Sequence, residues 1–192
     1  ATAGAGFDLP FTVMKSVSTL WAVSDPKVQQ VIFDAHTAAV TQALTLLEDR
    51  GLFTRTGSGG CRQEPPRGAI AAAFDHWDSR AGDPNLHTHV VLANKVQTLD
   101  GRWMTVDSRA LHPALVAISE TYETFLVDEL AGRLPVRWGW RTRRRRPPAL
   151  ELDGVDDRLM VAFSQRASQI DQAMTDVIAK FAATHGRGPN RI

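Results

Sequence analysis

Three histidines, His76, His87 and His89, lie within the stretch Gly68–Lys95, which contains two short runs with the composition of β-strands. Successive side chains of a strand point to opposite faces, so His87 and His89 should share a face, about 6.6–6.8 Å apart along the strand. If the loop 77–85 folds the first run back antiparallel, His76 is brought beside that pair. Three imidazoles on one face could hold a divalent metal ion and leave coordination positions open.

A less specific interpretation stands beside this one. A single histidine in a strand is usually a core or surface residue, and a pair at i, i+2 more often lacks a metal than holds one. The third histidine, at a distance that a hairpin can close, is what favours a metal site. An unrelated three-histidine enzyme with a small-molecule substrate would also explain the histidines, but not the sequence blocks that flank them.

The chain has the composition of one globular domain. Its 192 residues are 43% hydrophobic and 22% charged, enough for a substantial core. The single cysteine, Cys61, excludes an intrachain disulfide and fits a reducing compartment, so we expect a cytoplasmic protein. No run approaches the roughly 20 apolar residues that span a bilayer, and the first residues lack the pattern of a signal peptide, so no membrane insertion is expected.

Positive charge is concentrated in one segment, although the formal net charge is only +1. Seven arginines and no acidic residue lie between Arg133 and Arg146. A local basic patch on a nearly neutral protein favours a localised contact with a polyanion over non-specific coating.

The elements that must position the histidines begin with a strand and two helices. Apolar residues alternate with Asp8 in GFDLPF (6–11), a strand pattern that places this carboxylate on the face away from them. A short helix is expected within 12–23 and a long one over Pro26–Arg50. His36, inside the long helix, is interpreted as a packing or surface residue.

The rest of the chain mixes loops, short strands and helices. Thr54–Arg67 is rich in Gly, Ser and Pro and predicts a flexible loop. Tyr122, at an apolar position of a helix predicted over 113–134, is interpreted as a core residue. Further expected elements are a short strand at 103–107, strands at 136–140 and 149–152, and an interrupted helix over 155–185. Hairpins without regular βαβ alternation favour an α+β fold, with helices packed on one face of a mainly antiparallel sheet and the histidines on the other.

Four sequence blocks together resemble a known family. They are GFDLPF followed by TVMKSVS, then FDHWDSRAGDPNLHTHVVLAN, then DGRWMTVD, and finally FSQRASQI. In this order, over roughly residues 4–170, they closely resemble the relaxase domain of MobF-type (TrwC-like) conjugative relaxases, which belong to the HUH endonuclease superfamily. One departure is Val13-Met14-Lys15-Ser16, where the family usually reads Ala-Pro-Lys-Ser.

The resemblance implies an enzyme that nicks one strand of plasmid DNA at the origin of transfer. In that family a tyrosine attacks the scissile phosphate and becomes joined to the 5′ end. The family's metal-binding histidines fall on His76, His87 and His89, and its aspartate, which orients a metal histidine or acts as a base, falls on Asp8. The implied partners are single-stranded DNA with an origin hairpin, and other relaxosome proteins. Mg or Mn is the expected ion, although imidazoles would also accept Zn, Ni or Cu.

The expected DNA partner bears on the basic residues. Arginine suits bidentate contact with phosphate, but a charge run between strands is equally typical of a solvated turn. The residues that we expect to contact DNA are Lys15, Arg80, Arg141, Arg143, Arg144, Arg145 and Arg146.

The family's tyrosine lies upstream of the block that contains Asp8, and no tyrosine precedes that block here. We therefore expect residues 1–185 to form a relaxase domain without its tyrosine-bearing strand, inactive by itself, with 186–192 as a linker or the start of a further part. The alternative is a catalytically incomplete relaxase remnant that serves as a DNA-binding module.

Overall fold

A three-stranded antiparallel sheet forms the centre of the computed structural model, which describes residues 4–142 and 147–188. Its strands, in spatial order, are β1 (Gly6–Thr12), β5 (Pro84–Ala93) and β4 (Ala71–Asp78). The strand β5, which contains His87 and His89, is thus central, and β4, which contains His76, is an outer strand. The hairpin predicted from the histidine spacing is confirmed.

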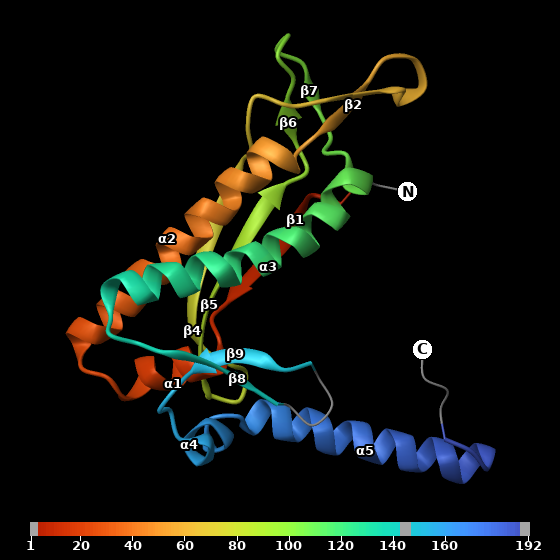
Figure 1. Ribbon diagram of the computed structural model, residues 1–192. Coiled ribbons are helices and arrows are strands. Elements are labelled where there is room, and N and C mark those ends of the chain that lie inside the picture. Colours follow the sequence, from red (N-terminus) through yellow and green to blue (C-terminus); the bar gives the residue numbers. More distant parts are fainter. Residues whose placement is uncertain (1–3, 143–146, 189–192) are drawn as a thin grey trace.

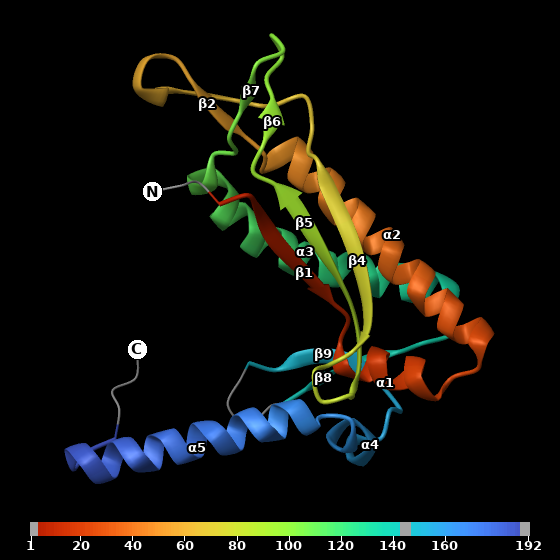
Figure 2. The same cartoon turned by 180° about the vertical axis from the view of Figure 1, so that it is seen from behind.

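Two long helices, α2 (Pro26–Arg50) and α3 (Ser108–Arg133), pack against each other and cover one face of the sheet (Figure 1). Seen from behind, the strands lie in front of both helices, and none of the helices in the described ranges covers this second face (Figure 2). We call it the open face. The predicted α+β fold, a mainly antiparallel sheet with helices on one side, is confirmed.

The sequence of α2 explains where it begins and which side it buries. The Asp25 side chain accepts hydrogen bonds from the backbone N–H groups of Lys27 and Val28, and Pro26 occupies the first helical turn. The fully or almost fully buried stripe consists of Ile32, Ala35, His36, Ala39, Ala43 and Leu47.

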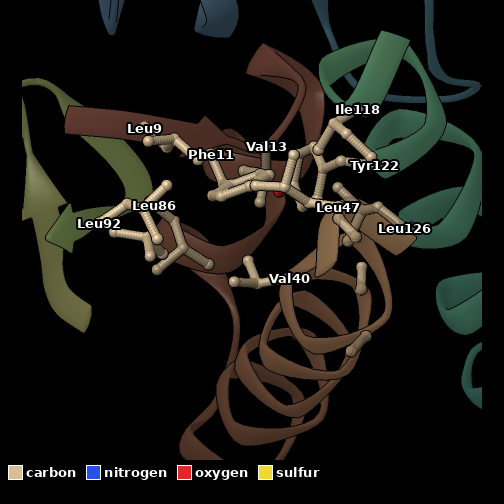
Figure 3. Packing of buried hydrophobic residues seen from close by; sticks show 14 of the residues in the cluster. Leu9, Phe11, Val13, Val40, Leu47, Leu86, Leu92, Ile118, Tyr122 and Leu126 are labelled. Carbon is tan, nitrogen blue, oxygen red and sulfur yellow. The ribbon is translucent and has the colours of Figure 1, made fainter. Parts of the chain in front are cut away.

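The core lies between the helices and the sheet (Figure 3). Leu9 and Phe11 reach it from β1, and Ile118 and Leu126 reach it from α3. The even-numbered residues of β5 complete it, namely Leu86, Thr88, Val90 and Leu92. Because strand side chains alternate, the same strand must present His87 and His89 on the open face.

The loop predicted over Thr54–Arg67 is wrong. This segment forms the hairpin of β2 (Thr54–Thr56) and β3 (Arg62–Glu64) around a 3-10 turn, η1 (Ser58–Gly60). A second small hairpin pairs β6 (Val96–Gln97) with β7 (Trp103–Met104). The turn between β2 and β3 contains glycines at positive φ, including Gly57 at 81° and Gly59 at 64°. The glycine content of this segment therefore indicates a tight turn between two strands, and not a loop without strands.

Helix α3 starts earlier than predicted because Asp107 is its N-cap and not a strand residue. The Asp107 carboxylate accepts from the backbone N–H of Arg109, and also from Arg55 Nε and Gln63 Nε2 of the β2–β3 hairpin. Pro113, the first residue of the predicted helix, lies inside the observed one.

The remaining elements gather at the other end of the sheet (Figure 1). They are α1 (Lys15–Val23), the hairpin of β8 (Trp138–Arg141) and β9 (Ala149–Leu152), α4 (Asp157–Ala162) and α5 (Gln165–His185). The interruption predicted within 155–185 is confirmed, at Phe163–Ser164. Among the described residues no helix is long and apolar enough to cross a membrane.

Candidate functional site

The register of the sheet brings the three predicted histidines together on the open face. His76 is the direct partner of His87 across the β4–β5 pair, and Phe74 is the partner of His89. The ring centroids lie 5.1 Å apart for His76 and His87, 5.4 Å for His76 and His89, and 5.2 Å for His87 and His89. Each imidazole therefore neighbours the other two.

Asp8 joins this cluster from β1. Pro10 is the register partner of His89 and Asp8 that of Val91, so the carboxylate lies diagonally across from the His89 ring. His89 Nδ1 lies 2.8 Å from Asp8 Oδ1 and 2.9 Å from Oδ2. A carboxylate accepts, so His89 carries its proton on Nδ1 and keeps the lone pair of Nε2 available for another ligand.

His87 is oriented in the same sense by its own strand. Its Nδ1 lies 2.7 Å from the backbone oxygen of Asn85, which can only accept. The Nδ1–H therefore donates to that carbonyl, and Nε2 again keeps its lone pair. His76 contacts both other rings and makes no ring hydrogen bond to a described residue. Two of the three imidazoles are thus held in the tautomer that metal ligation by Nε2 needs.

The cluster has the donors for a metal but not a formed coordination sphere. In residues 4–142 and 147–188, no group of three or more His, Cys, Asp or Glu side chains has the arrangement of a metal site. The rings of His76 and His87 are stacked, with 21° between their planes. Ligand nitrogens lie about 2.0–2.1 Å from a bound ion such as Zn²⁺, and side-chain rotation would be needed to reach one point. The three imidazoles are suitable ligands for a divalent ion, but their rings are not arranged around one common point.

The site is open to solvent and bordered by apolar side chains. The side chains of His89 and Asp8 are 35% and 57% exposed. Phe74 and Val91 are also exposed on this face. A substrate could therefore reach the imidazoles directly.

Behind the histidines lies a buried polar chain that the sequence did not reveal. His36 contacts the Tyr122 hydroxyl through Nδ1 and the Thr88 hydroxyl through Nε2, each at 2.7 Å. Burial lowers the pKa of His36 to about 4 and raises the pKa of the Tyr122 hydroxyl. The interpretation of Tyr122 as a core residue is confirmed, and His36 is likewise buried. Residues 86 positions apart leave no local signal of their contact.

Two of the predicted DNA contacts are engaged inside the protein. The Lys15 ammonium donates to the backbone oxygens of Pro84, at 2.9 Å, and Phe163. Burial lowers the Lys15 pKa. Arg141 donates to the Asp157 carboxylate and, at 2.7 Å, to the Val155 backbone oxygen.

The other predicted DNA contacts are placed differently. Arg80 is exposed in the turn between β4 and β5. Residues Arg143, Arg144, Arg145 and Arg146 lie outside the described part of the chain. For all of these residues, contact with DNA stays a prediction.

Comparison with known proteins identifies close similarity to one family. The family model described as TrwC relaxase matches residues 2–192. The multifunctional conjugation proteins TraI of Escherichia coli and of its strain K12 are 38% and 36% identical to this chain over 104 residues, 54% of its length.

Solved structures of the conjugative relaxase TrwC extend the similarity over the whole fold. A copper-bound complex with oriT DNA has a TM-score of 0.73 and 28% identity, and covers 98% of this chain. A complex with mutant oriT DNA has a TM-score of 0.75 and 27% identity, and covers 100%. The chain spans 59% and 63% of these two relatives, and 6% of the length of each TraI protein.

Proposed function

The chain belongs to the TrwC relaxase family, and we propose that it carries the metal-binding half of a site that nicks one DNA strand at a plasmid origin of transfer. The observation that supports this most directly is the cluster of His76, His87 and His89 on the open face, with Asp8 bonded to His89. The proposed partners are single-stranded DNA, the origin hairpin and other relaxosome proteins, in the cytoplasm.

The three imidazoles are the proposed ligands of a divalent ion. The neutral tautomers of His87 and His89, with Nδ1–H bonded and Nε2 free, suit this role. When bound, such an ion polarises phosphate oxygens and stabilises the charge that grows on them and on the leaving 3′ oxygen. Mg or Mn is proposed because the substrate is a phosphodiester, while three nitrogen donors equally suit Zn, Ni or Cu.

Asp8 is proposed to hold the His89 ring in one orientation and one tautomer. A carboxylate that accepts the Nδ1–H fixes the tautomer and increases the basicity of Nε2. The same carboxylate is solvent-exposed and is a candidate base toward an incoming hydroxyl.

The nucleophile is proposed to be a tyrosine outside residues 1–192. Its hydroxyl loses its proton to a base, its oxygen bonds to phosphorus, the bond from phosphorus to the 3′ oxygen breaks, and that oxygen takes up a proton. Tyr122 does not fit this role. It is buried on the helix side of the sheet, and its hydroxyl is bonded to His36.

A non-catalytic DNA-binding module is the second candidate. The observation that favours it is that Tyr122 is the single tyrosine of the sequence and is buried. This candidate predicts salt-sensitive DNA affinity without cleavage in the full-length protein.

Metal binding tests the assignment of the histidines. Titration calorimetry with Mn²⁺ and Zn²⁺ should show binding to the wild-type chain that is lost in His87→Ala and His89→Ala. His185→Ala, at an exposed position of α5, is the matched control and should bind as the wild type does. Absence of any divalent-ion binding by the wild type would overturn the metal assignment.

Nicking separates the two candidate functions. The full-length protein, supplied with metal and a supercoiled origin plasmid, should convert the plasmid to its relaxed form. The nicked strand should then be covalently joined to the protein. Tight binding of origin DNA without relaxation would favour the binding module.

A further inference from the structure

A chain of hydrogen bonds, buried from Tyr122 to Thr88, runs from α3 to the exposed Asp75 of β4 directly behind the histidines. Tyr122 Oη lies 2.7 Å from His36 Nδ1, and His36 Nε2 lies 2.7 Å from Thr88 Oγ1. Thr88 Oγ1 in turn donates to Asp75 Oδ1 at 2.6 Å. Four elements, α3, α2, β5 and β4, are joined by three short bonds.

All three hydrogen bonds donate in a fixed order. The Thr88 hydroxyl donates its proton to Asp75, so it must accept from His36 Nε2–H. His36 Nδ1 then carries the lone pair and accepts from the Tyr122 hydroxyl. With His36 neutral, each donor and acceptor that takes part in these three hydrogen bonds has a partner. A hydrogen-bond network with all its members paired favours one arrangement of the elements that it joins.

The chain of hydrogen bonds lies on the helix side of the sheet, directly behind the candidate site. Thr88 lies between His87 and His89 in sequence, and Asp75 precedes His76. Asp75 and Thr88 are direct register partners, beside the His76–His87 pair. The chain and the imidazoles therefore occupy opposite faces of the same few rungs of the β4–β5 ladder.

Apart from its backbone pairing with β5, strand β4 has few contacts that fix it to the rest of the protein. All eight of its residues are exposed, and among the described strands it pairs with β5 alone. Its register shifts between His76 and Asp78, which marks an irregularity next to the histidine. Trp77 contacts the Phe33 ring at a centroid distance of 5.6 Å, and the Thr88–Asp75 bond is the link to the buried interior.

We propose that Thr88, Asp75, His36 and Tyr122 are positioning residues that fix His76 opposite His87 and His89. This inference rests on the proposed metal site, because its purpose is to keep the third ligand in reach. A small displacement of an outer strand moves its histidine relative to the other two, and sites displaced by about 1 Å lose much of their function. Strand β4 has no buried apolar side chain to anchor it, and the hydrogen-bond network anchors it instead.

The test separates an effect on the coordination of a bound ion from a general loss of folding stability. Thr88→Val removes the hydroxyl and keeps the shape, and Thr88→Ser restores the hydroxyl. Leu47→Val, a core change outside the network, is the control that lowers stability alone. Bound Co²⁺ reports the coordination geometry through its visible absorption, and amide hydrogen exchange in β4 reports the strand without any metal.

We expect Thr88→Val to weaken Co²⁺ binding at least tenfold, to alter its spectrum and to speed β4 amide exchange. Thr88→Ser and Leu47→Val should keep the wild-type affinity and spectrum. Unchanged affinity, spectrum and exchange in folded Thr88→Val would overturn the positioning role. If Thr88→Val does not fold, Asp75→Ala, at an exposed position, decides the question by the same readouts.

The outcomes for this inference and for the proposed function are separable. A wild-type chain that binds no ion, but whose β4 exchange still rises in Thr88→Val, would overturn the metal assignment and leave the positioning of β4 supported. A wild-type chain that binds Co²⁺, with Thr88→Val unchanged in every readout, would overturn the positioning role alone.

Discussion

The Nδ1–H of His89 is shared between both carboxylate oxygens of Asp8, at 2.8 and 2.9 Å, across the β1–β5 pair. Both side chains are partly exposed, and exposed ion pairs contribute only about 0–1 kcal/mol to folding. The contact therefore matters more for the orientation of the ring than for the stability of the sheet.

Asp8→Ala should weaken divalent-ion binding by about 10–100-fold, because the carboxylate that orients the His89 ring is lost. The free energy of unfolding should change by less than about 1 kcal/mol. Calorimetric titration and urea unfolding measure the two effects. Asp34→Ala, which removes an exposed carboxylate of α2, is the control, and an equal loss of affinity there would contradict the role of Asp8.

His36 should make the stability depend on pH in a defined window. Burial lowers its pKa to about 4 from 6.5, with the charges of Asp75 and His87 as smaller influences. The unfolded chain therefore binds the proton first as pH falls, and stability on the order of 3 kcal/mol is lost between about pH 6.5 and 4.

Urea unfolding of the wild type and His36→Gln at pH 7, 5.5 and 4.5 checks this expectation. The wild type should be the more stable at pH 7, and the difference should shrink as the pH falls. Carboxylates that titrate in both proteins cancel in that difference. A difference that is constant with pH would show that His36 is not the titrating group.

Lys15→Ala should lower the free energy of unfolding by about 1–3 kcal/mol, because two backbone carbonyls lose a charged donor. The effect should be seen in chemical unfolding, and Lys27→Ala, at an exposed position, should show little change. A Lys15→Ala variant of normal stability but weaker DNA affinity would instead assign Lys15 to DNA contact.

Replacement of Arg143, Arg144, Arg145 and Arg146 by serine should weaken binding of single-stranded DNA. Each arginine that neutralises a phosphate should also reduce the slope of log K against log[salt] by about 0.7. Fluorescence anisotropy at several salt concentrations measures both quantities. A dispersed control that loses the same charge replaces four exposed cations, Lys27, Arg50, Arg158 and Lys180. Equal slopes for the two variants would indicate a general effect of charge.

Local periodicity predicted the parts of the fold that depend on neighbouring residues. The alternation around Asp8, and the His-Thr-His spacing, placed these side chains on one face because a strand has a two-residue period. The long helix from Pro26 was predicted from its cap, its proline and its apolar stripe.

Contacts between distant residues were not predictable in this way. Thr54 and Thr56 are buried, but the glycines between their strand and the next made the hairpin resemble a loop. The carboxylate of the Asp107 cap is also bound by Arg55 and Gln63, which lie 52 and 44 positions away. No local pattern indicates a role for Thr88, because its partners lie 52 and 13 positions away.

Strand β5 serves the core with one set of side chains and the candidate site with the other. Deletion of a single residue at its start would exchange the two sets, exposing Val90 and Leu92 and burying the imidazoles. The turn between Asp78 and Pro84 could change length without this exchange, because it lies outside the ladder. Over evolution, the residue count of β5 should therefore vary less than the identity of most of its residues, and insertions should collect in the neighbouring turn.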